Sequence, residues 1–276
     1  MEGGYLFHME WSTAEFRMII SEAQLNVWLG AYLWPLMRVG AMLLATPVFN
    51  SRQLPVQLRL LVLFVITWVI ATALPQQPAI DVLSHDGFII MLQQILIGVI
   101  MGFILQMVFG ALVFGGQVVA YSMGLGFASM VDPQNGVQVP VLAQYYLIFA
   151  TLMFLNLNGH LLMIELVADS FHTLPVALDG ISRNDLHEVV AWGSRMFAGG
   201  LLIALPIMGA MLMVNMGMGV VMRAAPALNI FSVGFPITML LGFALMWVTL
   251  PNVMNVFNNL LAEAFQLIMQ NLRVER

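Results

Sequence analysis

The sequence contains no cysteine and no lysine, and charged residues make up only 8% of its 276 positions. The absence of cysteine excludes disulfides, thiol nucleophiles and cysteine ligands for metals. With a net charge of −5 and scattered arginines, the chain offers no basic patch for nucleic acid. The five histidines have no partner at metal-ligand spacing, and no serine and histidine stand at a spacing that marks a catalytic pair. We therefore expect no enzyme activity, no cofactor and no nucleic-acid partner.

Apolar residues make up 61% of the chain, against roughly 45–50% in soluble domains. A single soluble core of this length cannot hide that excess, so the surface itself must be apolar. The chain is therefore predicted to be an all-α protein that crosses a membrane several times or is buried in an apolar assembly. Six runs are long enough to be spans, at 27–48, 56–74, 88–119, 140–168, 189–222 and 229–250.

Prolines punctuate these runs. Most of them, including Pro251, lie at or near the ends of the runs, as expected of residues that break helices. Pro35 and Pro206 lie inside, so the first and fifth spans are expected to be kinked. The run 88–119 would be almost ~50 Å long as one helix, which exceeds what a bilayer requires. We expect steep tilt, breaks, or helices that leave the membrane.

Both ends of what we interpret as one domain, residues 1–276, carry amphipathic patterns. Residues 9–24 predict a helix that lies on the membrane surface or against a partner subunit. The start of the chain is acidic and lacks a basic region, which argues against a cleavable signal peptide. The first span is therefore expected to stay in the mature protein. The C-terminal helix, 251–272, is expected to carry a stripe built almost wholly of amides, namely Asn252, Asn255, Asn259, Glu263, Gln266 and Gln270. This stripe is either an ordinary wet face or the lining of a water-filled path.

Ionisable residues inside apolar runs are costly in a membrane and are often functional. The candidates for buried polar or charged positions are Arg38, Arg59, Glu165, Arg195 and Arg223. The arginines fit positions near span ends or beside acids of neighbouring helices, whereas Glu165 lies deeper in its run. Glu165 is also the coupling residue of an alternative interpretation, a small-solute secondary transporter, although the repeated halves typical of transporters are absent.

Small residues recur in the apolar runs. Gly98 and Gly102 form a GxxxG motif, which predicts a close approach of two helices without identifying the partner helix. Adjacent or near-adjacent glycines at 115–116, 199–200 and 217–219 favour the same kind of close packing.

The joint between the third and fourth runs is unusual, since residues 123–140 read MGLGFASMVDPQNGVQVP. It combines glycines and prolines with bulky apolar side chains, and Asp132-Pro133 and Asn135-Gly136 predict turns. No strand precedes its glycines, which excludes a dinucleotide-binding loop. The sequence predicts a flexible, half-apolar loop.

Four segments together resemble the FliR family of flagellar export-gate subunits, which is related to the SctT subunits of virulence type III secretion. The segments are MGLGFASMVDPQNGVQVPVLAQ (123–144), FLNLNGHLLMIELVADSFHTLPV (154–176), PVFNSRQLPVQLRLLV (47–62) and VMRAAPALNIFSVGFPITMLLGF (221–243). The resemblance runs along most of the chain, and the ending FHTLPV looks more flagellar than virulence-type. The equivalent virulence subunit is the alternative.

The resemblance implies a channel subunit that joins FliP-like and FliQ-like subunits in a conical helical assembly, the FliPQR complex, at the bacterial cytoplasmic membrane. It further implies association with FlhB-like and FlhA-like export proteins inside the MS ring of the flagellar basal body, and passage of unfolded flagellar proteins. Helices of such an assembly are largely covered by partner subunits, with membrane lipid as the remaining neighbour. This arrangement would account for the overlong runs.

The resemblance also implies that loop 123–139 projects into the channel as a plug. Glycines permit its irregular backbone, and the bulky side chains obstruct the passage without covalent chemistry. The expected plug or gate residues are Met123, Gly124, Gly126, Phe127, Met130, Val131, Asp132, Pro133, Asn135 and Gly136.

Overall fold

The structure, a computed structural model, describes residues 22–50, 54–75, 80–82, 84–125, 141–224 and 234–274, with side chains from residue 27 onward. Within these ranges the chain forms seven α-helices and no strand, which confirms the all-α prediction. The helices are α1 (Glu22–Ala45), α2 (Val56–Ala73), α3 (His85–Ser122), α5 (Val141–Asn156), α6 (Gly159–Thr173), α7 (Arg183–Ala224) and α8 (Phe235–Leu272). Five helices are long and apolar enough to cross a membrane, or six if the bent pair α5–α6 counts as one span. This number agrees with the six apolar runs of the sequence.

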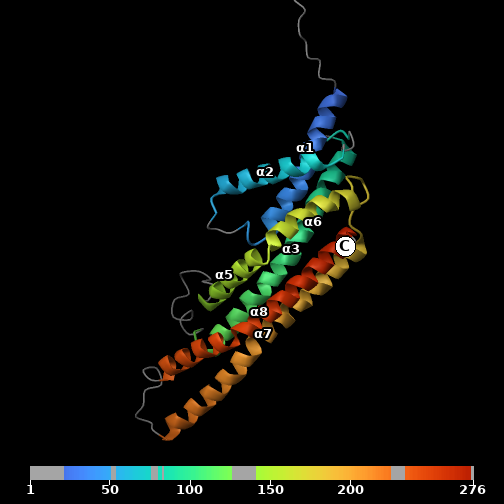
Figure 1. Ribbon diagram of the computed structural model, residues 1–276. Helices are drawn as coiled ribbons and strands as arrows, with labels where there is room; N and C mark the ends of the chain where they lie inside the picture. The colour runs from blue at the N-terminus through green and yellow to red at the C-terminus, as the bar shows by residue number, and fades with distance from the viewer. Residues whose placement is uncertain are drawn as a thin grey trace, which may run out of the picture.

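Helix α3 runs through the middle of the molecule and packs against α1, α5, α7 and α8 (Figure 1). It begins after Ser84, whose hydroxyl accepts a hydrogen bond from the Gly87 N–H at 3.0 Å, while Asp86 complements the positive end of the helix dipole. Half of its 38 residues are buried. At 1.5 Å per residue it is ~57 Å long, well beyond the ~30 Å hydrocarbon core of a bilayer. The long third run is therefore one continuous helix.

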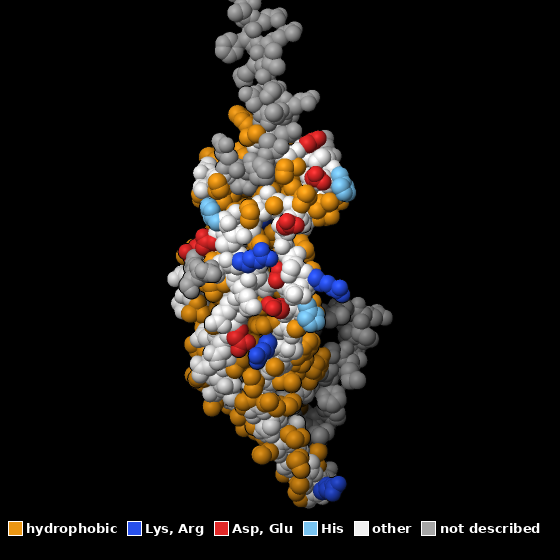
Figure 2. Space-filling model, turned by 90° about the vertical axis from the view of Figure 1, so that its right-hand side faces the viewer, with side chains coloured by type: hydrophobic (Ala, Val, Ile, Leu, Met, Phe, Trp, Pro, Cys, Tyr) orange, Lys and Arg blue, Asp and Glu red, His pale blue; other side chains and the backbone are white. Residues whose placement is uncertain are grey.

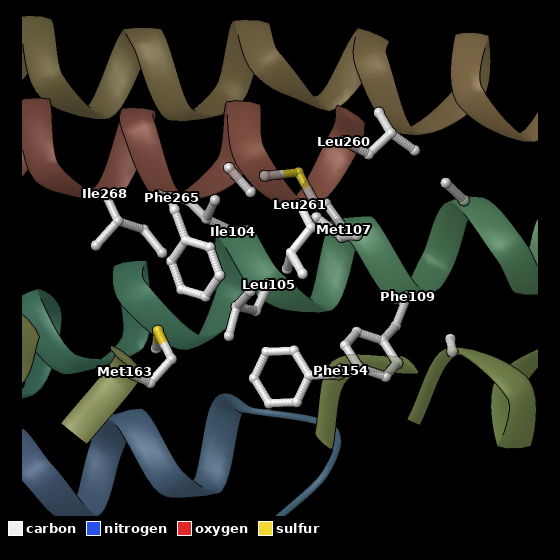
Figure 3. Packing of buried hydrophobic residues seen from close by; sticks show 14 of the residues in the cluster. Ile104, Leu105, Met107, Phe109, Phe154, Met163, Leu260, Leu261, Phe265 and Ile268 are labelled. Atoms are coloured by element: carbon white, nitrogen blue, oxygen red, sulfur yellow. The ribbon is translucent and has the colours of Figure 1, made fainter. Parts of the chain in front are cut away.

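The hydrophobic core surrounds α3 and includes buried residues of α1, α5, α6, α7 and α8. Figure 3 shows its part between α3, the bent pair α5–α6 and α8. The Phe109 ring of α3 meets Phe154 of α5 at 5.7 Å and Phe257 of α8 at 6.1 Å, both edge to face. All three rings are essentially fully buried. Aromatic contacts of this kind join α3 to the two halves of the chain that follow it.

The GxxxG motif brings α3 against α1. A Cβ placed on Gly98 would lie 2.2 Å from the Arg38 carbonyl oxygen, and one on Gly102 would lie 2.4 Å from the Ala45 Cβ. Only glycine permits this backbone-to-backbone distance. The structure therefore confirms the predicted close approach and identifies α1 of the same chain as the partner helix.

The other glycine pairs divide into two groups. Gly115 of α3 faces the backbone of Gly200 on α7, and Gly116 faces Ala143 on α5, so α3 is approached closely on three sides. In contrast, Gly217 and Gly219 of α7 have no neighbour within 4 Å in the described part of the chain.

The fourth apolar run is not one straight span. It divides at residues 157–158 into α5 and α6, which are bent by 65° relative to each other. Asn158 adopts a left-handed conformation with φ 56°, and Gly159 packs its backbone against the Phe154 ring, where a Cβ would lie 2.4 Å from the ring. The Asn158-Gly159 dipeptide is a turn signal that the uniform hydrophobicity of 140–168 conceals.

The prediction that Pro251 ends a helix is wrong, because α8 continues from Phe235 through Pro251 to Leu272. Pro251 is exposed, so its ring lies at the surface of the chain. Met246 and Val253 are buried on either side of it and hold both parts of α8 against the molecule. The predicted amphipathic helix 251–272 is thus the second half of α8, while residues 9–21 of the predicted N-terminal helix lie outside the described residues.

Candidate functional site

The root of the predicted plug loop is fixed by the C-terminal end of α3. Gly124 has φ 82°, its N–H donates to the Tyr121 carbonyl, and the Leu125 N–H donates to the Ala120 carbonyl, both at 3.0 Å. This pair of bonds is the Schellman arrangement, which requires a left-handed residue after the helix and therefore favours glycine. Gly124 thus stops α3 at a defined point.

Both arms of the α7–α8 hairpin also contact this root. Met123 is only 1% exposed and lies over Gly242 of α8, where a Cβ would be 2.4 Å from the Met123 Cε. On the α7 side, the Asn215 side-chain nitrogen donates to the Ser122 carbonyl at 3.4 Å. The chain enters the loop from a backbone that three helices hold in place.

These positions correct the sequence prediction for two of its ten plug residues. Met123 belongs to the packed core and Gly124 to the helix end, so neither is free to project into a passage. The other predicted plug residues, Gly126 to Gly136, lie outside the described residues.

The polar stripe of α8 lies at the surface of the chain. Its five amides are exposed and Glu263 is partly exposed, whereas the opposite face of the same helix is buried, formed by Val253, Phe257, Leu260, Leu261, Ala264 and Ile268. The second half of α8 is therefore amphipathic, as its sequence indicates. Whether the stripe lines a passage stays a prediction.

Three polar contacts connect this stripe to the neighbouring helix α7. Glu263 lies 3.8 Å from Arg195, Gln270 donates to Glu188 at 3.4 Å, and Asn252 donates to the Leu202 carbonyl at 3.4 Å. The Arg195 and Glu263 side chains are 62% and 42% exposed, so this ion pair contributes little to stability. The contacts show the register at which the antiparallel helices α7 and α8 face each other.

Arg38 is the one predicted buried charge that is fully buried, with 0% exposure. From α1 it donates through Nε to the Gln94 side-chain oxygen of α3 at 2.8 Å, through Nη1 to the Ser170 hydroxyl of α6 at 2.9 Å, and through Nη2 to the Leu174 carbonyl at 2.9 Å. Its guanidinium also lies 3.9 Å from the centre of the Phe171 ring. One side chain therefore joins α1, α3 and α6 in the interior.

The remaining four ionisable candidates do not share this interior. Arg59 is half-buried and donates to the Asn50 side chain at 2.9 Å, and Arg195 pairs with Glu263 as described. Glu165 and Arg223 are exposed on the chain surface. Within this chain Glu165 is therefore exposed rather than buried, and the transporter interpretation gains no support from its position.

Sequence reasoning missed the polar partners of Arg38. Gln94 and Ser170 are buried polar residues within apolar helices. In the sequence, an isolated polar residue within an apolar run was the signal that could have identified them. It could not pair them with Arg38, because they are 56 and 132 residues away in the chain. In the described ranges no three His, Asp or Glu side chains gather as metal ligands.

Large apolar side chains cover much of the surface beyond these polar contacts. Figure 2 shows charged side chains gathered over the upper part of one face, while the lower part is largely hydrophobic. The distal arms of the α7–α8 hairpin are the part of α7 after Pro206 and the part of α8 before Pro251. In these arms Met213 is 76% exposed, Leu240 72% and Trp247 83%. A soluble monomer rarely exposes so large an apolar surface, so these arms require an apolar neighbour.

Comparison with known proteins identifies near full-length relatives. Residues 29–264 match a protein family described as bacterial export proteins, family 1. The chain is 38% identical to the flagellar biosynthetic protein FliR of Escherichia coli (strain K12), over 91% of this chain and 95% of that protein. It is 36% identical to FliR of Pectobacterium carotovorum subsp. carotovorum, over 87% and 92%. Similarity extends to the surface presentation of antigens protein SpaR of Shigella flexneri, at 24% identity over 76% of this chain and 81% of that protein.

Proposed function

The chain belongs to family 1 of the bacterial export proteins, and we propose that it is a channel subunit of the flagellar protein export gate in the bacterial cytoplasmic membrane. The observation that carries this proposal is the similarity to FliR proteins along almost their whole length. The more distant similarity to SpaR makes a virulence-type gate the less favoured assignment. In this role the chain forms a passage for unfolded flagellar proteins and performs no chemistry of its own.

The exposed apolar arms support assembly with other subunits. Gly209, Gly217 and Gly219 of α7 are glycines at which a Cβ would meet nothing, so another helix can approach their backbone closely. Met213 and Met216 beside them are 76% and 68% exposed, and methionine adapts its shape to a neighbouring surface. We assign these arms to FliP-like and FliQ-like subunits, with FlhB-like and FlhA-like proteins and the MS ring further out.

We further propose that loop 126–139 is the plug of the passage. Its root at Met123 and Gly124 is held by α3, α7 and α8, which gives the loop a fixed point of departure. Phe127, Met130 and Val131 supply apolar bulk, and the two turn dipeptides supply compactness. The amide stripe of α8 is the proposed wet surface of the same assembly.

Co-expression tests the assignment to an export gate. The tagged chain should co-purify with FliP-like and FliQ-like subunits from the same genome and should aggregate or degrade when it is expressed alone. A strain that lacks the gene should have no flagella and regain them on complementation. A stable, self-sufficient monomer that supports solute uptake in vesicles would contradict the proposal.

Conductance of the assembled complex tests the plug separately. Deletion of residues 127–136 should leave the complex intact but allow ions to leak across a planar bilayer, whereas the intact chain stays closed. A matched deletion in another connection, residues 76–79, should not leak. A loop deletion that assembles normally and remains closed would exclude the plug role without affecting the assignment to the gate.

A further inference from the structure

Helix α2 differs from the other long helices in how little of it is covered. Only Thr67 and Ile70 are buried, while Phe64 and Trp68 are 58% and 65% exposed. The helix packs chiefly against α1 and has 18 residues, or ~27 Å, close to the thickness of a bilayer's hydrocarbon core.

The composition of α2 is suited to lipid rather than to another helix. It contains neither glycine nor serine, and its four small residues, Thr67, Ala71, Thr72 and Ala73, all lie in its second half. The rest is mainly leucine, valine, isoleucine and aromatic residues. Helix–helix contacts in membranes are enriched in small residues, which let backbones approach. The distal arm of α7 carries open glycines, whereas the first half of α2, beside the groove described next, contains no small residue.

A groove of about 260 Å³ runs between α1 and the beginning of α2. Its lining is almost wholly apolar, formed by Gly40, Leu43, Leu44, Phe49, Leu54, Leu58, Leu60, Val62 and Leu63, together with Arg59. Gly40 forms part of the floor beside Leu63, since a Cβ there would lie in ordinary contact with a Leu63 carbon at 3.5 Å. The groove is continuous with the exposed leucines of α2, so whatever covers that helix also reaches the groove.

Arg59 is the only charged residue of α2 and lies in its first turn. It lines the apolar groove, is half-buried, and donates through Nη1 to the Asn50 side-chain oxygen at 2.9 Å, which fixes the guanidinium at this end of the helix. A cation at the end of a membrane-length helix lies at the level of the lipid headgroups. The guanidinium has five N–H donors in a fork that matches the oxygens of a phosphate.

We propose that this groove binds an anionic phospholipid, with one acyl chain between α1 and α2 and the phosphate at Arg59. The apolar lining fits the acyl chain, and Arg59, the one cation among the described lining residues, fits the headgroup charge. The proposal goes beyond the export function, because it assigns a lipid site to a helix that the described part of this chain leaves largely uncovered. It does not depend on whether the chain forms a protein channel.

Photolabelling tests the site in the unmodified protein. The full-length chain, with any subunits that co-purify, is placed in nanodiscs containing phosphatidylglycerol or phosphatidylcholine with a diazirine on the acyl chain. Adducts on Leu44 and Leu58 should be roughly fivefold more frequent with phosphatidylglycerol, the effect of ~1 kcal/mol per cation near an anionic headgroup. Equal labelling by both lipids would overturn the proposal. In a second experiment a photoreactive amino acid replaces Leu44 or Leu58, and crosslinking of another polypeptide to either position would also overturn the proposal.

A variant and its control separate the effect of the charge at Arg59 from the effect of the protein's net charge. Arg59→Gln should reduce the preference for phosphatidylglycerol to near unity, whereas Arg223→Gln, which removes the same charge at the end of α7, should keep it. Retention of the preference in Arg59→Gln would overturn the assignment of the headgroup to this residue. If Arg59→Gln does not accumulate, the labelling ratio of the unmodified protein decides alone.

Discussion

Replacement of Arg38 by methionine is the strongest test of the interior described above. The variant keeps an unbranched apolar stem but loses the bonds to Gln94, Ser170 and Leu174. Each acceptor left unpaired in the core costs ~1–3 kcal/mol, and the stacking on Phe171 is worth at most ~2 kcal/mol. Because removal of a buried cation also recovers part of its desolvation cost, we expect a net loss of ~4 kcal/mol in stability.

A loss of this size is measurable as a fall in the thermal unfolding midpoint and in the yield of the purified protein or complex. Folded domains are stable by only ~5–15 kcal/mol, so Arg38→Met should accumulate poorly and complement a deletion strain weakly. Arg183→Met, which removes an exposed arginine at the start of α7, is the matched control and should change stability by less than ~0.5 kcal/mol. Arg38→Lys should fall between them, because an ammonium group cannot reproduce the planar fork.

A rescue experiment separates the proposed cause from a general intolerance of change. If the cost of Arg38→Met comes from orphaned acceptors, then adding Gln94→Leu and Ser170→Ala removes two of them and should recover ~2–4 kcal/mol. An Arg38→Met protein as stable as the parent would refute the reasoning, since the three hydrogen bonds would then contribute nothing. A triple variant less stable than Arg38→Met alone would do the same.

Three other substitutions test separate contacts. Gly98→Ala should disrupt the α1–α3 contact and strongly reduce accumulation, because the new Cβ would lie 2.2 Å from the Arg38 carbonyl oxygen. Gly193→Ala is the control: its Cβ would make an ordinary contact at 3.6 Å from the Met107 sulfur, so the detergent-resistant yield should be unchanged. Gly124→Ala should lower stability by ~1–2 kcal/mol in thermal unfolding because of its φ of 82°, with Gly124→Asn closer to the parent. Pro251→Ala should restore a main-chain bond and raise the unfolding midpoint, and a lower midpoint would mean that α8 depends on the proline.

The helices were predictable because an apolar run of span length has few other stable forms in a membrane or an apolar assembly. The same uniformity conceals where a run breaks. The bend at Asn158 falls inside residues 140–168, where apolar residues face every direction and periodicity gives no boundary. Pro251 shows the opposite error, because a local breaker does not end a helix whose flanks are both anchored by packing.

The candidate site was predictable only where the residues that form a feature lie close together in the sequence. The amphipathic second half of α8 is a local pattern, and the structure reproduces it. The Arg38 cluster depends on residues from three helices, so the arginine was recognisable as unusual while its acceptors were not. Met123 was misassigned because its role is set by Gly242, 119 positions later, and not by the flexible loop beside it.

The α7–α8 hairpin changes character at one level along its length. Arg195 opposite Glu263 and Leu202 opposite Asn252 place Pro206 and Pro251 at nearly the same height, on adjacent antiparallel helices. Beyond that height neither arm carries a charge until Arg223, and Trp247 and Met213 are largely exposed, whereas on the other side the amides of α8 face outward. Each proline removes a main-chain hydrogen bond at the level where the surroundings change, although both helices continue through it. A single pair of helices thereby meets two environments, and both arms of this pair also hold Ser122 and Met123 at the root of the loop. Both arms of the hairpin therefore contact the chain at the point where that loop departs.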